Sequence, residues 1–342
     1  MSRKKVTLQQ LAAELGLSRM TVSKALRGLP GMSLETRREV LELAQKIGYR
    51  TREQVDSGLL ERTSLAAIRQ RRFFIVLEDQ SSGPNSIHME LIKGLNEGYR
   101  GTGCLVTPLF LPPALPAGAA PFAGWAEDSG LLYADGIFIP PMILPDIEQL
   151  LLQLPLPRVL INFPPSGAAA DSVIWDVYDS VRQGVGRLAA KSPSRILYVG
   201  DTSSTRGFRL RWSAFLDAMD GLGIRVDPAQ HLTFPFSPEY PWQQRFQQLL
   251  QPGVPYAILN TIEGNLPWVH YLCTQAGLQI PDPCSLVTLD VKQTQEYAGV
   301  DYFYMPVQET GSRAADLMLW RIANPHRPYE HVRIQGHFLS RP

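Results

Sequence analysis

Two short helix patterns joined by a very short turn constrain the N-terminal part of this chain more than any other feature. In the first pattern apolar residues recur at helical spacing over residues 8–15, Thr7 is the expected N-cap and Gly16 ends the helix. Ser18, the N-cap of the next helix, follows after a single connecting residue. Two helices joined so closely must pack across each other, which predicts a helix-turn-helix unit.

The second and third helix patterns indicate which faces are buried. Val22, Ala25 and Leu26 are expected to face inward. A third helix, capped by Ser33 and stopped by Gly48, supplies a further apolar stripe. Three such helices can bury one another's stripes but little more, so the unit is a small all-α domain. The side chains left outward or at the margins of the second helix are Arg19, Met20, Ser23, Lys24 and Arg27.

The charge distribution favours a nucleic-acid partner for this domain. Residues 1–72 carry a net charge of +8 and the remainder −7, although the whole chain is only +1. A basic head on an acidic body is typical of a phosphate-binding head whose affinity falls with salt. Arg19 and Lys24 can donate to the acceptors of guanine in the major groove, whereas Met20 offers only an apolar contact. The alternative is that these cations form a merely solvated face.

The residues of this domain resemble the headpiece of the lactose-repressor (LacI) family of bacterial transcription regulators. The resemblance lies in Val6-Thr7-Leu8-Gln9-Gln10-Leu11-Ala12, in residues 17–28, in Ser33-Leu34-Glu35-Thr36-Arg37 and in Gly48-Tyr49-Arg50, without a gap. It implies a regulator, most simply a repressor, that acts as a homodimer (a tetramer stays open) on a near-palindromic double-stranded operator. It also implies that Arg19, Met20 and Lys24 contact bases and that Thr7, Ser18, Thr21 and Ser23 contact mostly phosphates. Arg27 completes this part of the predicted DNA-binding set.

Residues 51–72 form the expected linker, and here the chain departs from the family. The usual Pro-Asn after Tyr49 is missing, and Gly58 stands where the family places a leucine that wedges into the minor groove. Leu59 or Leu60 can take that role, in the manner of apolar side chains that unstack a base step. The other interpretation is that these leucines pack against the body of the protein.

From residue 73 onward strand patterns alternate with helix patterns. Phe73-Phe74-Ile75-Val76-Leu77 is a continuous apolar run, as is typical of a strand buried on both faces. Intervening helices predict parallel sheets built from βαβ units. The fold class is therefore α/β, with an N-terminal all-α domain. Further strands are expected at residues 105–111, 135–140, 158–162, 195–200, 256–259 and 285–290.

These strands resemble the sensor body of the same family, a two-lobed domain like type I periplasmic binding proteins. The resemblance implies a headpiece at residues 1–50 and an effector-binding and dimerisation domain at 73–342. The chain is expected to cross between lobes near Asn162, Asp290 and Asn324. This assigns residues 73–162 and 291–323 to the first lobe, and 163–290 and 324–342 to the second.

The resemblance also implies a small-molecule effector, with carbohydrates as one class, in the cleft beyond the strand ends. Its predicted contacts are Asp79, Arg206, Arg211, Phe236 and Asp290. Each has a structural alternative: Arg211 can pair with a carboxylate, Asp290 can cap a turn and Phe236 can pack beside prolines. Where the family usually places Asn-Asp after a strand, this chain has Asn260-Thr261-Ile262-Glu263-Gly264. A vestigial pocket that binds no effector is therefore an alternative interpretation.

Other functional classes find little support. The chain has no P-loop, Gly-x-Ser-x-Gly, His-Glu-x-x-His or Cys-x-x-Cys motif, and its three cysteines and six histidines lack metal-ligand spacing. We therefore expect no enzyme activity, no metal and no cofactor. Without an apolar leader or span, a cytoplasmic location is expected. Two alternatives remain: a solute-binding protein with a non-functional headpiece, and an effector-independent DNA-binding protein.

Overall fold

The computed structural model describes residues 7–26, 32–47, 71–78, 86–113, 118–191, 195–234, 242–250, 256–262, 264–282, 284–290 and 297–339. Backbone contacts divide the chain into two compact units. Met1–Ser172 and Gly311–His331 form the first, and Val173–Thr310 and Val332–Pro342 form the second.

Three helices form the N-terminal domain, as predicted: α1 (Leu8–Leu15), α2 (Arg19–Leu26) and α3 (Leu34–Ile47). Thr7 caps α1 through a reciprocal pair of bonds with Gln10, whose Oε1 accepts from the Thr7 amide at 2.9 Å. Gly16 ends α1 at φ 64°, the left-handed conformation that glycine adopts without a steric cost. The helices bury one shared core, made of Leu11, Ala12, Val22, Ala25, Val40 and Ala44.

The first sheet has six strands in the order β10-β5-β4-β3-β1-β2. The pairs from β2 to β5 are all parallel, as βαβ units require. The strands are β1 (Arg72–Leu77), β2 (Leu105–Phe110), β3 (Gly136–Ile139), β4 (Arg158–Leu160), β5 (Asp171–Trp175) and β10 (His331–Ile334).

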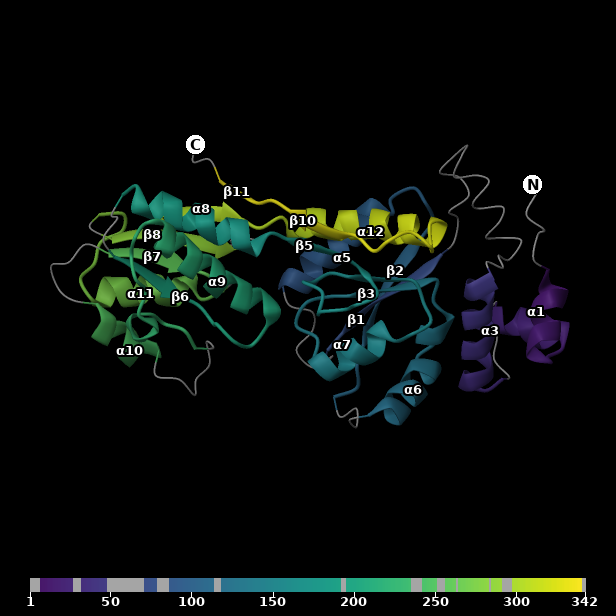
Figure 1. The fold of residues 1–342 in the computed structure, drawn as a ribbon. Coiled ribbons are helices and arrows are strands. Elements are labelled where there is room, and N and C mark those ends of the chain that lie inside the picture. Colours follow the sequence, from purple (N-terminus) through teal and green to yellow (C-terminus); the bar gives the residue numbers. More distant parts are fainter. Residues whose placement is uncertain are drawn as a thin grey trace. The chain divides into compact units, whose positions relative to one another are not determined.

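Helices cover both faces of the first sheet (Figure 1). On one face lie α5 (Ser86–Gly98) and α12 (Val307–Ala323), and on the other lie α6 (Ala119–Asp128) and α7 (Pro145–Leu152). Two glycines allow the close approach of α12: a Cβ on Gly98 would lie 2.7 Å from Ala315, and one on Gly136 would lie 2.6 Å from the Met318 sulfur. A short 3-10 turn, η2 (Leu131–Tyr133), follows α6.

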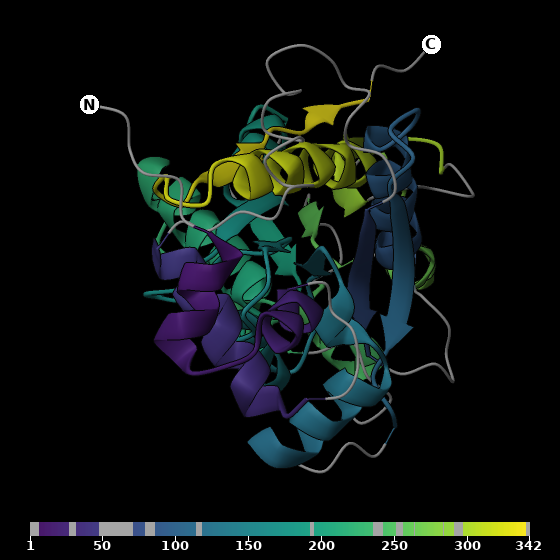
Figure 2. The same cartoon turned by 90° about the vertical axis from the view of Figure 1, so that its right-hand side faces the viewer.

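The second sheet has five strands in the order β11-β9-β8-β7-β6, parallel from β6 to β9, with β11 antiparallel to β9. Its strands are β6 (Ile196–Val199), β7 (Tyr256–Asn260), β8 (Cys284–Asp290), β9 (Val300–Tyr304) and β11 (His337–Phe338). Its helices are α8 (Val177–Ala189), α9 (Arg206–Gly221), α10 (Trp242–Leu249) and α11 (Leu266–Gln275), with the 3-10 turn η3 (Pro228–Gln230) after α9. Figure 2 shows the whole chain turned by 90° about the vertical axis.

The chain crosses between the units at points other than those predicted. β5 pairs with β4 in the first sheet, so the first crossing falls at residues 172/173 and not near Asn162. β9, which was not predicted, pairs with β8 in the second sheet, so the second crossing falls at 310/311 and not near Asp290. The third falls at 331/332 rather than near Asn324. Pairing between distant strands decides these points, and local sequence does not report it.

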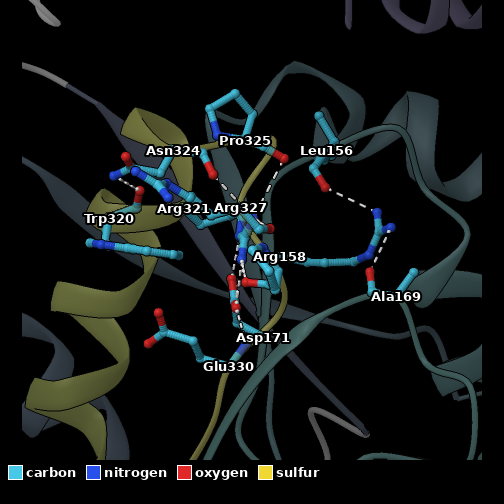
Figure 3. Close-up of polar contacts among 11 residues, drawn as sticks. Leu156, Arg158, Ala169, Asp171, Trp320, Arg321, Asn324, Pro325, Arg327 and Glu330 are labelled. Carbon is cyan, nitrogen blue, oxygen red and sulfur yellow. Dashed lines mark hydrogen bonds and ion pairs between the residues drawn. The ribbon is translucent and has the colours of Figure 1, made fainter. Parts of the chain in front are cut away.

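A buried ion pair holds two crossing segments of the first unit together (Figure 3). Arg321, near the end of α12, donates from Nη2 to Asp171 Oδ1 at 2.8 Å, and the Glu330 amide donates to the same oxygen at 2.8 Å. Arg321 also donates to backbone carbonyls of the 324–328 segment. The two side chains are 7% and 0% exposed, so the charges compensate each other away from water.

Candidate DNA-binding helix and effector site

The exposed face of α2 is the first candidate site. Val22 and Ala25 are buried, whereas Arg19, Met20 and Lys24 are exposed, Met20 to 69% of its surface. Ser18 caps the helix by accepting from the Thr21 amide at 3.0 Å. The helix therefore presents two cations and one long apolar side chain to solvent, on a backbone that its cap and its buried face hold in place.

Arg37 positions α2, and the sequence reasoning assigned it no such role. Its Nη2 donates to the carbonyl oxygen of Ala25 at 3.1 Å, so α3 binds the last turn of α2. The residue is only 5% exposed, and burial lowers the pKa of its guanidinium. A carbonyl near a helix C-terminus is one of the acceptors that the helix itself leaves unpaired. Nothing in local spacing identifies such a contact.

The other predicted DNA-binding residues fall into two groups. Thr7, Ser18, Thr21 and Ser23 lie on α1, on α2 or at their N-caps, and are exposed or half-buried. The Ser18 and Thr21 hydroxyls lie 2.8 Å apart and bond to each other. Arg27 and Leu59 lie outside the described residues.

The carboxyl edge of the second sheet is the second candidate site. Arg206 begins α9 behind its N-cap Thr205, and Arg211 lies on the same helix. Arg211 donates from Nη1 to the carbonyl oxygen of Thr261 at 2.7 Å and lies over the Phe208 ring, 5.0 Å from its centroid. This bond attaches α9 to the loop that follows β7.

Two buried amides lie around the end of β7. Asn260 ends the strand, is 0% exposed and donates to the Thr288 hydroxyl at 3.0 Å, but its Oδ1 has no hydrogen-bond partner among the described residues. Asn265, just before α11, is also 0% exposed, and neither of its side-chain polar atoms has a partner there. Buried amides are almost always hydrogen-bonded, so these atoms are open to a partner beyond the described residues, a role that water or a ligand can fill. The sequence reasoning named Asn260 only as a departure from the family and missed Asn265.

The loop before α9 is shaped by close contacts at the end of β6. Asp201, 3% exposed, accepts from the Ser203 amide at 2.8 Å. A Cβ on Gly200 would lie 2.0 Å from the Thr261 hydroxyl, so only glycine fits there. Burial raises the pKa of Tyr198 to about 12, which keeps its phenol neutral in this cluster.

The structure brings part of the predicted effector set to one place. Arg206 and Arg211 start α9, and Asp290 ends β8, beside β7 in the same sheet. Asp79 and Phe236 lie outside the described residues. Beside Asp79, Glu78 accepts a hydrogen bond from the Leu144 amide, and burial raises the pKa of its carboxyl group.

Within the residues that the structure describes, no helix is long and apolar enough to cross a membrane. The same residues contain no group of three or more His, Cys, Asp or Glu side chains arranged to hold a metal ion.

Comparison with known proteins finds a family and curated relatives that match this chain. The family described as periplasmic binding protein-like domain matches residues 185–341. A stretch of 45 residues is 56% identical to the HTH-type transcriptional regulator AglR of Rhizobium meliloti (strain 1021), and this match covers 13% of each protein. The probable HTH-type transcriptional repressor ExuR of Bacillus subtilis (strain 168) is 19% identical over 342 residues, 98% of this chain and 97% of that protein.

Solved structures of similar fold cover nearly the whole chain. The transcriptional regulator CelR-cellobiose complex superposes with a TM-score of 0.66 at 17% identity, covering 98% of this chain and 99% of that one. The lac repressor dimer bound to operator and the anti-inducer ONPF superposes with a TM-score of 0.63 at 17% identity, covering 99% and 98%. The chain is similar to LacI-family regulators: the periplasmic binding protein-like family matches its C-terminal part, and the lac repressor has the same fold.

The superposition on the lac repressor spans 99% of this chain and so includes both candidate sites. The predicted fold class is confirmed: N-terminal helices followed by two parallel α/β sheets match the lac repressor fold. The two curated relatives are both named as HTH-type transcriptional regulators, one of them as a probable repressor.

Proposed function

We propose that this chain is a cytoplasmic repressor of the LacI family that binds a near-palindromic operator as a homodimer, and that a small molecule bound to the body weakens or strengthens its binding to the operator. The observation that carries the proposal is the exposed face of α2. Arg19 and Lys24 project from a helix that Ser18 caps and that Arg37 attaches to α3. A rigid helix that exposes one cation in its first turn and one in its last turn suits the major groove.

The remaining DNA contacts are proposed from the sequence. Thr7, Ser18, Thr21 and Ser23 lie where hydroxyl groups can donate to phosphates, and such contacts position a headpiece without reading sequence. Arg27 and Leu59 belong to the same proposal as a further cation and a minor-groove wedge. The net charge of +8 on residues 1–72 supplies a binding energy that is sensitive to salt.

An exposed aromatic pair on α11 supports self-association. Trp268 and Tyr271 are 49% and 47% exposed, and their ring centroids lie 6.0 Å apart. Aromatic side chains are enriched in the buried parts of protein interfaces. A second copy of the chain on this face would bury both rings and pair two headpieces, as a two-fold operator requires. The structure of the lac repressor dimer on its operator supports this assembly by analogy.

The effector site is proposed at the carboxyl edge of the second sheet. Arg206, Arg211 and Asp290 are there, together with the Asn260 Oδ1 and the side-chain amide of Asn265, polar atoms without a hydrogen-bond partner among the described residues. This set offers donors and acceptors to a ligand with several hydroxyl groups, and cellobiose in the CelR complex is such a ligand in a protein of this fold. Asp79 and Phe236, which lie outside the described residues, belong to the same proposal on the sequence alone.

The DNA-binding proposal is tested with the full-length chain and duplexes selected from a random library. Changing Arg19 and Lys24 to alanine is expected to reduce affinity at least 100-fold per dimer, because each good base contact contributes about 1–3 kcal/mol. Arg38→Ala is the matched control, since this exposed cation on α3 pairs with Glu42. Unchanged affinity in the double variant would favour the solute-binding alternative.

The effector proposal is tested by thermal shift against a panel of neutral and acidic sugars. A bound ligand stabilises the folded chain, so at least one sugar is expected to raise the melting temperature. Arg211→Met should abolish that shift while leaving operator binding in the absence of ligand unchanged. A chain that binds operator but shows no shift with any sugar would support the effector-independent alternative.

A further inference from the structure

Met20 stands at the centre of the exposed face of α2. At about 100° per residue, it projects roughly 170° from the midpoint between Val22 and Ala25, the two buried residues of the helix. Arg19 lies about 90° from that midpoint and Lys24 about 130°. The side chain that points most directly away from the headpiece core is therefore the apolar one.

Met20 is 69% exposed, the highest value among the large hydrophobic side chains of the described residues, although its neighbours are polar or basic. The hydroxyls of Ser18 and Thr21 bond to each other beside it. A polar residue would be expected there in a helix that only faces water. Met20 thus fits a partner surface that has an apolar group at its centre.

The floor of the major groove offers one apolar group, the 5-methyl group of thymine. We infer that Met20 recognises a thymine methyl at the centre of each operator half-site, and that Arg19 and Lys24 contact guanines beside it. This inference rests on the DNA-binding function proposed above and adds the bases that the site must contain. A thioether chain is flexible and polarisable, so it can cover a methyl group without a strict geometry.

The helix spacing places the bases relative to one another. Met20 and Lys24 are four residues apart on one side of α2, which separates them by about 6 Å along the helix axis. With a rise of about 3.4 Å per base pair, this corresponds to roughly two base-pair steps when the helix follows the groove. A guanine is therefore expected within about two base pairs of the recognised thymine.

The experiment removes the methyl group from the DNA. Full-length protein selects its site from a random duplex library, and the thymines of the selected half-sites are then replaced one at a time by uracil. Loss of one buried methyl group should weaken binding about 4-fold per half-site, and about 15-fold when both half-sites are changed. Uracil outside the helix footprint is the control. Replacement of the neighbouring guanines by 7-deazaguanine should cost at least 5-fold each.

The protein variants assign the effect to Met20. Met20→Ala should bind the thymine and uracil sites equally, whereas Gln9→Ala, an exposed change on α1, should keep the wild-type preference. If the chain selects a site but tolerates uracil at every thymine, or selects half-sites without A·T pairs, the inference is wrong and DNA binding stands. If no sequence is enriched, the proposed function fails and the inference fails with it.

Discussion

The headpiece and the body hold their functional side chains in different ways. In the headpiece, the capping bonds of Ser18 with Thr21 and of Ser33 with Thr36 join residues three positions apart. In the body, the bond from Arg211 reaches 50 residues along the chain, and the pair of Arg321 with Asp171 spans 150. Many weak local contacts therefore support the DNA-binding face, whereas a few strong long-range contacts support the body.

This difference predicts that single changes have larger effects in the body. Arg321→Met removes one partner of the buried ion pair. The Asp171 carboxylate, which is 0% exposed, is then left without its cation. Loss of one partner of a buried pair costs about 3–5 kcal/mol. We expect the free energy of unfolding to fall by that amount in urea titrations followed by tryptophan fluorescence. All six tryptophans lie beyond residue 120, so this signal reports the body and not the headpiece.

Arg100→Met is the matched control for Arg321→Met. Arg100 pairs with Glu97 at 3.5 Å, but its side chain is 79% exposed, and such surface pairs contribute less than about 1 kcal/mol. Similar losses in the two variants would contradict the view that buried long-range contacts dominate the stability of the body.

His231 gives the body an acid sensitivity that the headpiece lacks. Burial lowers the pKa of its imidazole to about 4, and its Nδ1 accepts from the Tyr198 amide at 3.0 Å. The His231 imidazole takes up a proton near pH 6.5 in the unfolded chain but only near pH 4 in the folded chain. The free energy of unfolding therefore has its full value above pH 6.5 and decreases as the pH falls to 4. The loss is roughly 3 kcal/mol.

The measurement is unfolding by urea at several pH values, followed by tryptophan fluorescence, to which Trp212 beside His231 contributes. His231→Asn keeps an acceptor for the Tyr198 amide but does not titrate, so its stability should vary less between pH 6.5 and pH 4. An identical pH profile for both proteins would show that His231 is not the group responsible.

The two regions also differ in how much of them was predictable. The headpiece helices follow from caps and apolar spacing alone. Thr7, Gly16 and Ser18 begin or end a helix through contacts with residues within one helical turn of themselves. In the body, the buried strands were recognised but β9 was not, since this five-residue strand is defined by its pairing with β8. The positions where the chain changes unit were misplaced for the same reason.

The candidate site of the body shows the same limit. Arg206 and Arg211 were found through the family resemblance, but the carbonyl partner of Arg211 lies on a distant loop. Asn265 carries no local signal, because a lone asparagine before a helix is normally a cap. In the structure it makes no side-chain cap bond and its amide is buried. Burial and missing partners appear only when distant segments are brought together.

Among the headpiece contacts, the cap of α2 should have the largest effect. Ser18→Ala removes the acceptor for the Thr21 amide and is expected to lower headpiece stability by about 1 kcal/mol. Circular dichroism should detect the loss of helix, whereas tryptophan fluorescence of the body should not change. Ser18→Asp, which retains an acceptor, should restore the helix content; a body transition shifted by Ser18→Ala would contradict the independence of the two regions.

The smallest effect is expected for the exposed ion pair on α3. Arg38 and Glu42 lie 3.4 Å apart at one helical turn, and both side chains are 62% exposed. Such pairs contribute about 0.3–0.5 kcal/mol and are screened by salt, so Glu42→Gln should shift the headpiece transition slightly at low salt and not at high salt. A larger shift that persists in high salt would mean that Arg38 supports the headpiece through packing, and the headpiece would then depend on single contacts as the body does.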